Sequence, residues 1–187
     1  MVTLVACSDG TGDTETTVVS PTSSSQPSVA VRVGGAPAQP SRGSRAPVGY
    51  DPCVSLSDSV VAQAGFDPLT RERADLVFDD YALIGCEFDR KEQVRGQNVS
   101  VGFMTVSSTN VSLDEFKQRE SGSARSVNVG GRDAITYRPP ADGGCFVVIA
   151  GPDAAISIHV SSSALTPWNA CENSVQIAET IEAALPK

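Results

Sequence analysis

The side chains with the most distinctive chemistry in this chain of 187 residues are its five cysteine thiols. A thiol can be alkylated, can bind zinc or can pair in a disulfide. Cys7 stands apart near the N-terminus, and the other four are Cys53, Cys86, Cys145 and Cys171. Setting Cys7 aside leaves an even number, which predicts two disulfides and an oxidising compartment.

Four cysteines allow three pairings, of which we favour Cys53 with Cys86 and Cys145 with Cys171. Each of these pairs would join a helix end to a nearby strand, whereas interleaved pairings demand longer cross-links. Each bridge would close a loop of about 30 residues and stabilise the fold by roughly 3 to 4 kcal/mol. Zinc binding is the alternative, but the chain has no CxxC spacing and its single histidine lies in a strand-like stretch. We therefore expect no metal and no cofactor.

Cys7 ends a motif that predicts lipid attachment. Leu4-Val5-Ala6-Cys7 is similar to the bacterial lipobox, in which small residues precede a cysteine that receives a diacylglyceryl group. Two or more acyl chains would give the stable membrane attachment that one chain cannot give. Met1-Val2-Thr3 has no basic residue and too little apolar length for a complete signal peptide, so we expect the true start upstream. The alternative is a chance cysteine beside ordinary apolar residues.

The residues after Cys7 predict a tether. Residues 8–47 are dominated by Ser, Thr, Pro, Gly and Ala and contain no aromatic residue, so they cannot bury enough apolar surface to offset chain entropy. A coil of about 40 residues spans roughly 35 Å on average and would hold a domain away from the lipid surface. We divide the chain into a truncated lipoprotein signal (1–7), a disordered tether (8–47) and one disulfide-stapled domain (48–187). The predicted location is the extracytoplasmic face of the cell membrane, with Cys7 as the anchor.

Charge and hydropathy exclude two classes of function. The net charge is −8 and the pI is near 4.6, whereas binding to a phosphate backbone depends on clustered Lys and Arg. Nucleic acid is therefore not an expected partner. No stretch approaches the roughly 20 apolar residues that a membrane-spanning helix requires.

The sequence of the domain contains patterns that are typical of helices and strands. Ser55-Leu56-Ser57-Asp58 predicts a capped helix that stops at Gly65, Ser112 with Glu115 predicts a second capping box, and residues 172–185 predict a closing amphipathic helix. Strands are predicted at 83–88, 98–106, 127–129, 134–137, 146–149 and 156–160. This order predicts an α+β fold: an antiparallel sheet of about six strands, with helices packed mainly on one face and two disulfides.

Several short elements of the domain can be compared with a known family. They are Asp51-Pro52-Cys53, Ala64-Gly65-Phe66-Asp67-Pro68, Gly85-Cys86-Glu87-Phe88, Val129-Gly130-Gly131-Arg132-Asp133-Ala134, and the late Cys145 and Cys171. Together they resemble an actinobacterial lipoprotein family of unknown function that includes the mycobacterial Lpr-type lipoproteins. The resemblance covers residues 50–185 and implies a lipidated envelope protein without a catalytic residue. A looser similarity to extracellular sensor domains of mycobacterial kinases implies paired disulfides on an α/β sandwich.

Three other features are candidate sites. His159 could act as a base, but no nucleophile elbow or acidic partner can be identified, so we expect an exposed strand histidine on the side opposite the isoleucines. Trp168 could rim a ligand cleft, although packing near the Cys145 to Cys171 region is the simpler expectation. The acidic residues lack the spacing of a calcium loop and predict a solvated face; they are Asp75, Asp79, Asp80, Glu87 and Asp89.

We therefore predict a lipid-anchored, non-catalytic binding or interaction module with an envelope protein, glycan or lipid as its partner. One alternative is an extracytoplasmic small-ligand sensor or carrier, which requires an apolar cavity of several hundred Å³. The other is a carboxylate-based envelope hydrolase, which requires two acidic side chains that converge in a pocket.

Overall fold

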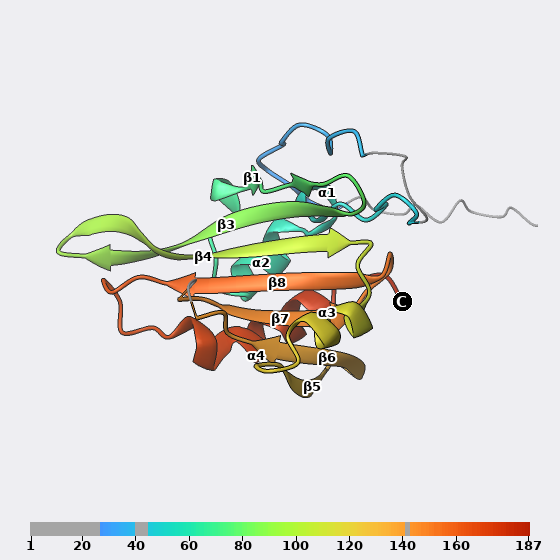
Figure 1. Cartoon of the computed structure of the whole chain (residues 1–187). Coiled ribbons are helices and arrows are strands. Elements are labelled where there is room, and N and C mark those ends of the chain that lie inside the picture. Colours follow the sequence, from blue (N-terminus) through green and yellow to red (C-terminus); the bar gives the residue numbers. More distant parts are fainter. Residues whose placement is uncertain (1–26, 40–44, 141–142) are drawn as a thin grey trace, which may run out of the picture.

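The computed structural model describes residues 27–39, 45–140 and 143–187. Cys7, the predicted signal and the first part of the predicted tether lie outside the described residues. The described chain forms an antiparallel sheet of eight strands with a few helices and two disulfides (Figure 1). The prediction of about six strands is too low, because it misses two short strands, β1 (Glu72–Arg73) and β2 (Leu76–Val77). Two residues are too few to leave an alternating pattern in the sequence.

The six longer strands follow the predicted positions and build the body of the sheet. Their order across the sheet is β1-β3-β4-β8-β7-β6-β5, and β2 also pairs with β3. The strands are β3 (Ala82–Val94), β4 (Gln97–Thr109), β5 (Arg125–Val129), β6 (Arg132–Tyr137), β7 (Cys145–Ala150) and β8 (Ala155–Ser162). β3 and β4 extend beyond β8, whose pairing with β4 ends at Gly102 and Ser162, so the hairpin projects as an arm (Figure 1).

One face of the sheet carries the main hydrophobic core. It is covered by α1 (Pro52–Ser55), α2 (Asp58–Gln63) and α4 (Ala170–Glu182). The strand residues that point to this face alternate with residues that point away, as Ile156, Ile158 and Val160 do in β8, and all three are fully buried. The helices contribute Leu56, Val61, Ala178 and Ile181 to the same core.

The opposite face is only partly covered. α3 (Leu113–Arg119) packs against β6 and β7, where Leu113 joins a smaller core with Ile135 and Val148. In front of β3, β4 and β8 this face carries none of the described helices (Figure 1). We call this uncovered part the open face.

Local capping explains where the helices begin. The predicted capping box of α3 is present, because the Ser112 side chain accepts the Glu115 N–H and the Glu115 carboxylate accepts the Ser112 N–H. The first predicted helix is divided in two. Asp51 caps α1 and Ser57, rather than Ser55, caps α2. A short 3₁₀ helix, η1 (Pro68–Thr70), then leads into β1.

Part of the segment predicted as a tether makes contacts with the domain. The Asp58 N–H donates to the Ser28 carbonyl at 2.9 Å, and the Ala30 N–H donates to the Asp58 carboxylate at 2.7 Å. Val33 packs against the main core. Farther along, Arg45 forms two hydrogen bonds with the Glu115 carboxylate at the start of α3. Within the described ranges, no helix combines the length and the apolar character needed to span a bilayer.

Candidate binding site on the open face of the sheet

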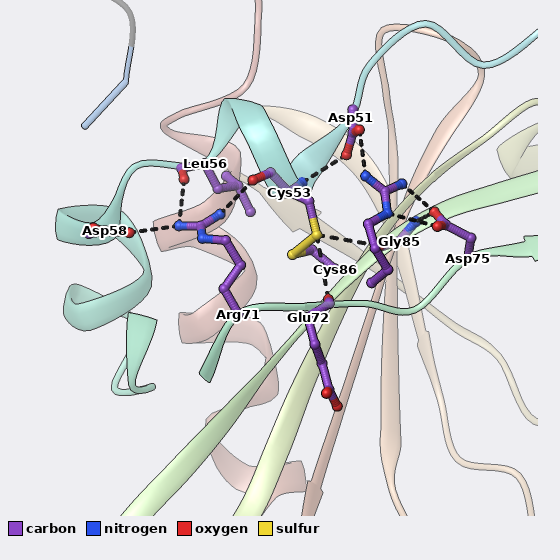
Figure 2. The surroundings of a disulfide bond; sticks show 10 residues. Asp51, Cys53, Leu56, Asp58, Arg71, Glu72, Asp75, Gly85 and Cys86 are labelled. Carbon is purple, nitrogen blue, oxygen red and sulfur yellow. Dashed lines mark hydrogen bonds and ion pairs between the residues drawn. A yellow bond between two sulfur atoms is a disulfide. The ribbon is translucent and has the colours of Figure 1, made fainter. Parts of the chain in front are cut away.

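Two disulfides are present, and they are the pairs that the sequence favours. Cys53 in α1 is bonded to Cys86 in β3, with 5.0 Å between the Cα atoms, and both residues are almost wholly buried (Figure 2). Cys145 in β7 is bonded to Cys171 in α4, with 5.2 Å between the Cα atoms. Each disulfide therefore ties a helix on the core face to a strand of the sheet.

Arg71 lies beside the first disulfide as a buried cation. Its guanidinium donates to the carbonyl oxygens of Cys53 and Leu56, each at 3.0 Å, and to the Asp58 carboxylate at 2.8 Å (Figure 2). The same guanidinium lies 4.9 Å from the centre of the Phe88 ring. A buried charge is costly unless it is paired and hydrogen-bonded, so these contacts fix α1 and the start of α2 against the sheet.

Arg73 also stabilises the surroundings of this disulfide, through hydrogen bonds to two carboxylates. It donates to Asp51 at 2.6 Å and, through Nε, to Asp75 at 2.7 Å. The hydrogen bond to Asp75 is the main reason that the pKa of Arg73 is raised above its ordinary value. The Asp75 carboxylate also accepts the Gly85 N–H at 3.0 Å.

Gly85 allows the chain between β1 and β2 to approach β3. The Ala74 N–H donates to the Gly85 carbonyl at 3.0 Å, and a Cβ atom on Gly85 would collide with the Ala74 carbonyl oxygen. The disulfide, Arg73 and Gly85 together therefore fix the position of residues 74–76. These residues form one wall of a groove on the open face.

The groove has a volume of about 390 Å³. Leu76 and Leu83 form an apolar wall, and Phe146 and His159 line the opposite side. Three hydroxyl side chains lie between them, those of Thr105, Ser107 and Ser157. Ser107 and Ser157 face each other across β4 and β8 and are both buried. The site therefore combines apolar walls with hydroxyl groups, which can both donate and accept hydrogen bonds.

Strand register aligns the side chains at one end of the groove. Glu87, Thr105, His159, Phe146 and Tyr137 are direct neighbours in turn across β3, β4, β8, β7 and β6. The Thr105 hydroxyl donates to the Glu87 carboxylate at 2.9 Å. The Phe146 ring stacks on His159 with 4.2 Å between the ring centres and on Tyr137 with 5.1 Å. This row of stacked rings gives the groove a fixed edge.

The structure modifies the expectations for His159 and Trp168. His159 is on the side of β8 opposite the isoleucines, as predicted, but it is half-buried rather than exposed and stacks on Phe146. Trp168 packs against the main core. Its ring meets the Phe66 ring edge-on at 6.0 Å and lies 4.4 Å from the Arg90 guanidinium.

The predicted acidic neighbourhood does not act as a unit. Asp79 and Asp80 are exposed, Asp75 is held by Arg73 and Gly85, and Glu87 accepts from Thr105. In the described part of the chain, no group of three or more His, Cys, Asp and Glu side chains could hold a metal ion. Asp75 is the one acidic residue among the described residues that line the open-face groove.

Sequence reasoning did not single out the hydroxyl groups of the groove. Ser157 and His159 alternate with buried isoleucines, which indicates that they share the second face of a strand. Thr105 and Ser107 show the same alternation around the buried Val106. Only the pairing of β4 with β8 brings the two polar sets together.

The fold and the groove define a disulfide-stapled α+β domain with a half-covered antiparallel sheet. The chain belongs to the family described as "Protein of unknown function (DUF3558)", whose model matches residues 2–184. Comparisons with curated proteins and with solved structures gave no match. The Asp51-Pro52-Cys53 and Gly85-Cys86 elements that carried the resemblance in the sequence meet at the first disulfide (Figure 2).

Proposed function

We propose that this protein is a non-catalytic binding module, anchored by lipid at Cys7 to the extracytoplasmic face of the cell membrane. In this proposal the open-face groove binds a small amphipathic molecule. The observation that carries the proposal is the groove itself, with apolar side chains and hydroxyl groups on a part of the sheet that the described helices leave uncovered. Its volume of about 390 Å³ lies within the range of small-molecule sites.

The lining favours a particular kind of ligand. Leu76, Leu83 and Phe146 offer apolar contact, and Thr105, Ser107 and Ser157 offer hydroxyl groups. Among the described residues that line the groove there is no Lys or Arg, so this lining has no permanent cation to pair with an anionic group. The ligand that fits this chemistry has an apolar body and an uncharged polar group. Such a ligand also suits the small-ligand sensor or carrier.

The lining also favours binding over carboxylate catalysis. The hydrolase alternative needs two acidic groups with separate roles in one pocket. The acidic residue of this groove, Asp75, already forms hydrogen bonds with Arg73 and with the Gly85 N–H. Its position is explained by the support it gives to the groove wall.

A binding titration tests the groove. N-phenyl-1-naphthylamine, a neutral apolar fluorophore, should bind to the full chain with a saturable increase in fluorescence. Thr105→Phe should reduce its affinity by roughly tenfold, because the larger side chain occupies the groove and displaces contacts worth about 1.4 kcal/mol. Ser126→Phe is the matched control, because Ser126 is exposed on β5 and does not line the groove, and it should retain the affinity. Equal affinity in wild type and Thr105→Phe would remove the groove from the proposal.

The lipid anchor is tested by intact mass. Protein extracted from membranes should carry the added mass of acyl groups on Cys7, and reduction should add the four hydrogen atoms of two opened disulfides. A Cys7→Ser variant should lose the acyl mass and leave the membrane fraction. Wild-type protein that is found in the cell interior with a free Cys7 thiol would contradict the anchor and the location.

A further inference from the structure

A second groove lies between the end of α2 and the outer side of α4. Its volume is about 310 Å³, and Trp168 and Arg90 line it together with residues of both helices. It is separate from the open-face groove, because the two linings have no described residue in common. The two helices belong to the face of the sheet that carries the main core.

Amide and hydroxyl side chains dominate the helical walls of this groove. They are Gln63 at the end of α2 and Asn173, Gln176 and Thr180 on α4. The spacing of three and four residues places the α4 members along one stripe of the helix. Two of these groups already donate one hydrogen bond each, the Asn173 amide to the Asn169 carbonyl at 2.7 Å and the Thr180 hydroxyl to the Gln176 carbonyl at 3.1 Å. Their oxygens and the second Asn173 N–H, together with the amides of Gln63 and Gln176, can match a ligand that carries several hydroxyl groups.

Little charge is available to a ligand in this groove. Arg90 is the one charged residue in the lining, as far as the described ranges of the chain go. Its guanidinium is paired with the Glu92 carboxylate at 3.1 Å, donates to the Gly65 carbonyl at 3.0 Å and lies over the Trp168 ring. These contacts already compensate its charge, so the groove favours neither an anionic nor a cationic ligand.

We propose that this groove is a binding subsite for a neutral carbohydrate. Sugar hydroxyl groups both donate and accept, as the amides of Gln63, Asn173 and Gln176 do. The part of the Trp168 ring that Arg90 does not cover supplies apolar surface for the C–H groups of a sugar ring, whereas Ile177 is 5% exposed and adds little. The proposal is independent of the ligand in the open-face groove, because the two sites have different linings.

Trp168 provides a direct reporter, because it is the single tryptophan in the chain. Tryptophan fluorescence of the full chain would be titrated with three neutral trisaccharides: maltotriose, mannotriose and N,N′,N″-triacetylchitotriose. At least one should produce a saturable change. Asn173→Ala and Gln176→Ala should each weaken that binding roughly tenfold, the effect of losing about one hydrogen bond to the ligand. Glu179→Ala is the matched control, because Glu179 is an exposed residue of α4 outside the groove, and it should bind as wild type does.

Two results would overturn the carbohydrate site. The first is the lack of a saturable response to all three trisaccharides in both fluorescence and isothermal titration calorimetry. The second is equal affinity in wild type, Asn173→Ala and Gln176→Ala. Gln176 is exposed and Asn173 is half-buried, so both variants should keep the fold, which far-UV circular dichroism would verify. Saturation of the open-face groove with N-phenyl-1-naphthylamine should leave the trisaccharide affinity unchanged, which separates this test from that of the first groove.

Discussion

Replacing Arg71 with methionine should remove a large part of the stability of the domain. The arginine side chain is fully buried and donates to the carbonyls of Cys53 and Leu56 and to the Asp58 carboxylate. Methionine keeps an apolar stem that can pack on Phe88, but it has no donor. The substitution therefore leaves three acceptors without the group that they bind.

The expected size of the effect follows from these contacts. A buried group that loses its hydrogen-bond partner costs about 1 to 3 kcal/mol, so the two carbonyls together account for roughly 2 to 6 kcal/mol. The Asp58 pair adds less, because the Asp58 side chain is 21% exposed and water can replace the arginine. Apolar contacts of the methionine recover part of the loss. We expect a net decrease of about 3 kcal/mol in the free energy of unfolding, a large share of the usual 5 to 15 kcal/mol.

Urea unfolding of the oxidised protein, followed by Trp168 fluorescence and circular dichroism, measures this decrease. Arg125→Met is the matched control, because Arg125 is exposed on β5 and its loss should change the stability by less than about 0.5 kcal/mol. An Arg71→Met protein as stable as the control would show that the buried arginine does not hold α1 and α2 to the sheet.

Three further predictions concern stability. Replacing Cys53 and Cys86 together with alanine should lower the free energy of unfolding in urea by about 3 to 4 kcal/mol, because the disulfide closes a loop with a sequence separation of 33. Burial raises the pKa of Tyr50 to about 12, so its contribution is complete below pH ~10 and is lost as the pH rises toward 12. Tyr50→Phe should remove that alkaline loss in denaturation curves at each pH. Hydrogen bonds from Arg45 and then Ser112 lower the pKa of Glu115, so its contribution is present above pH ~4.3 and is lost on acidification. Glu115→Gln should flatten the acid side of the stability profile, and an unchanged profile would contradict the role of this ion pair.

Local patterns predicted most of the regular structure. The six longer strands have alternating apolar residues, and the Ser112 to Glu115 capping box marks α3 at its observed start. The Gly130-Gly131 turn is present between β5 and β6, with φ angles of 59° and 91°. These features depend on residues close together in the chain, so a single sequence is sufficient to reveal them.

The remaining features depend on contacts between distant segments. β1 and β2 form because Arg73, Asp75 and Gly85 hold two short stretches against β3. These stretches show no alternation of apolar and polar residues in the sequence. The part of the predicted tether that contacts the domain does contain a pattern typical of an ordered segment, the alternating Val29, Val31 and Val33. A Ser- and Pro-rich composition surrounds this pattern. Its partner, Asp58, lies 28 residues away from Ala30.

The candidate site was the hardest part to foresee. Its hydroxyl groups come from β4 and β8, and one of its walls comes from the connection between β1 and β2. The single histidine, His159, is a candidate site residue in the sequence, but its position in the lining of the groove depends on the register of β8 with β4 and β7. A sequence shows which side chains share a face, whereas the structure shows which faces meet.

The most direct test of a binding function is the identity of any small molecule that copurifies with the protein. Wild type and Thr105→Phe would be purified from the cells that make them without added ligand, and small molecules released by denaturation would be quantified by mass spectrometry. Our account predicts close to one equivalent of an uncharged amphipathic compound in wild type and a much smaller amount in Thr105→Phe. Equal amounts in the two proteins, or no bound compound in either, would contradict it.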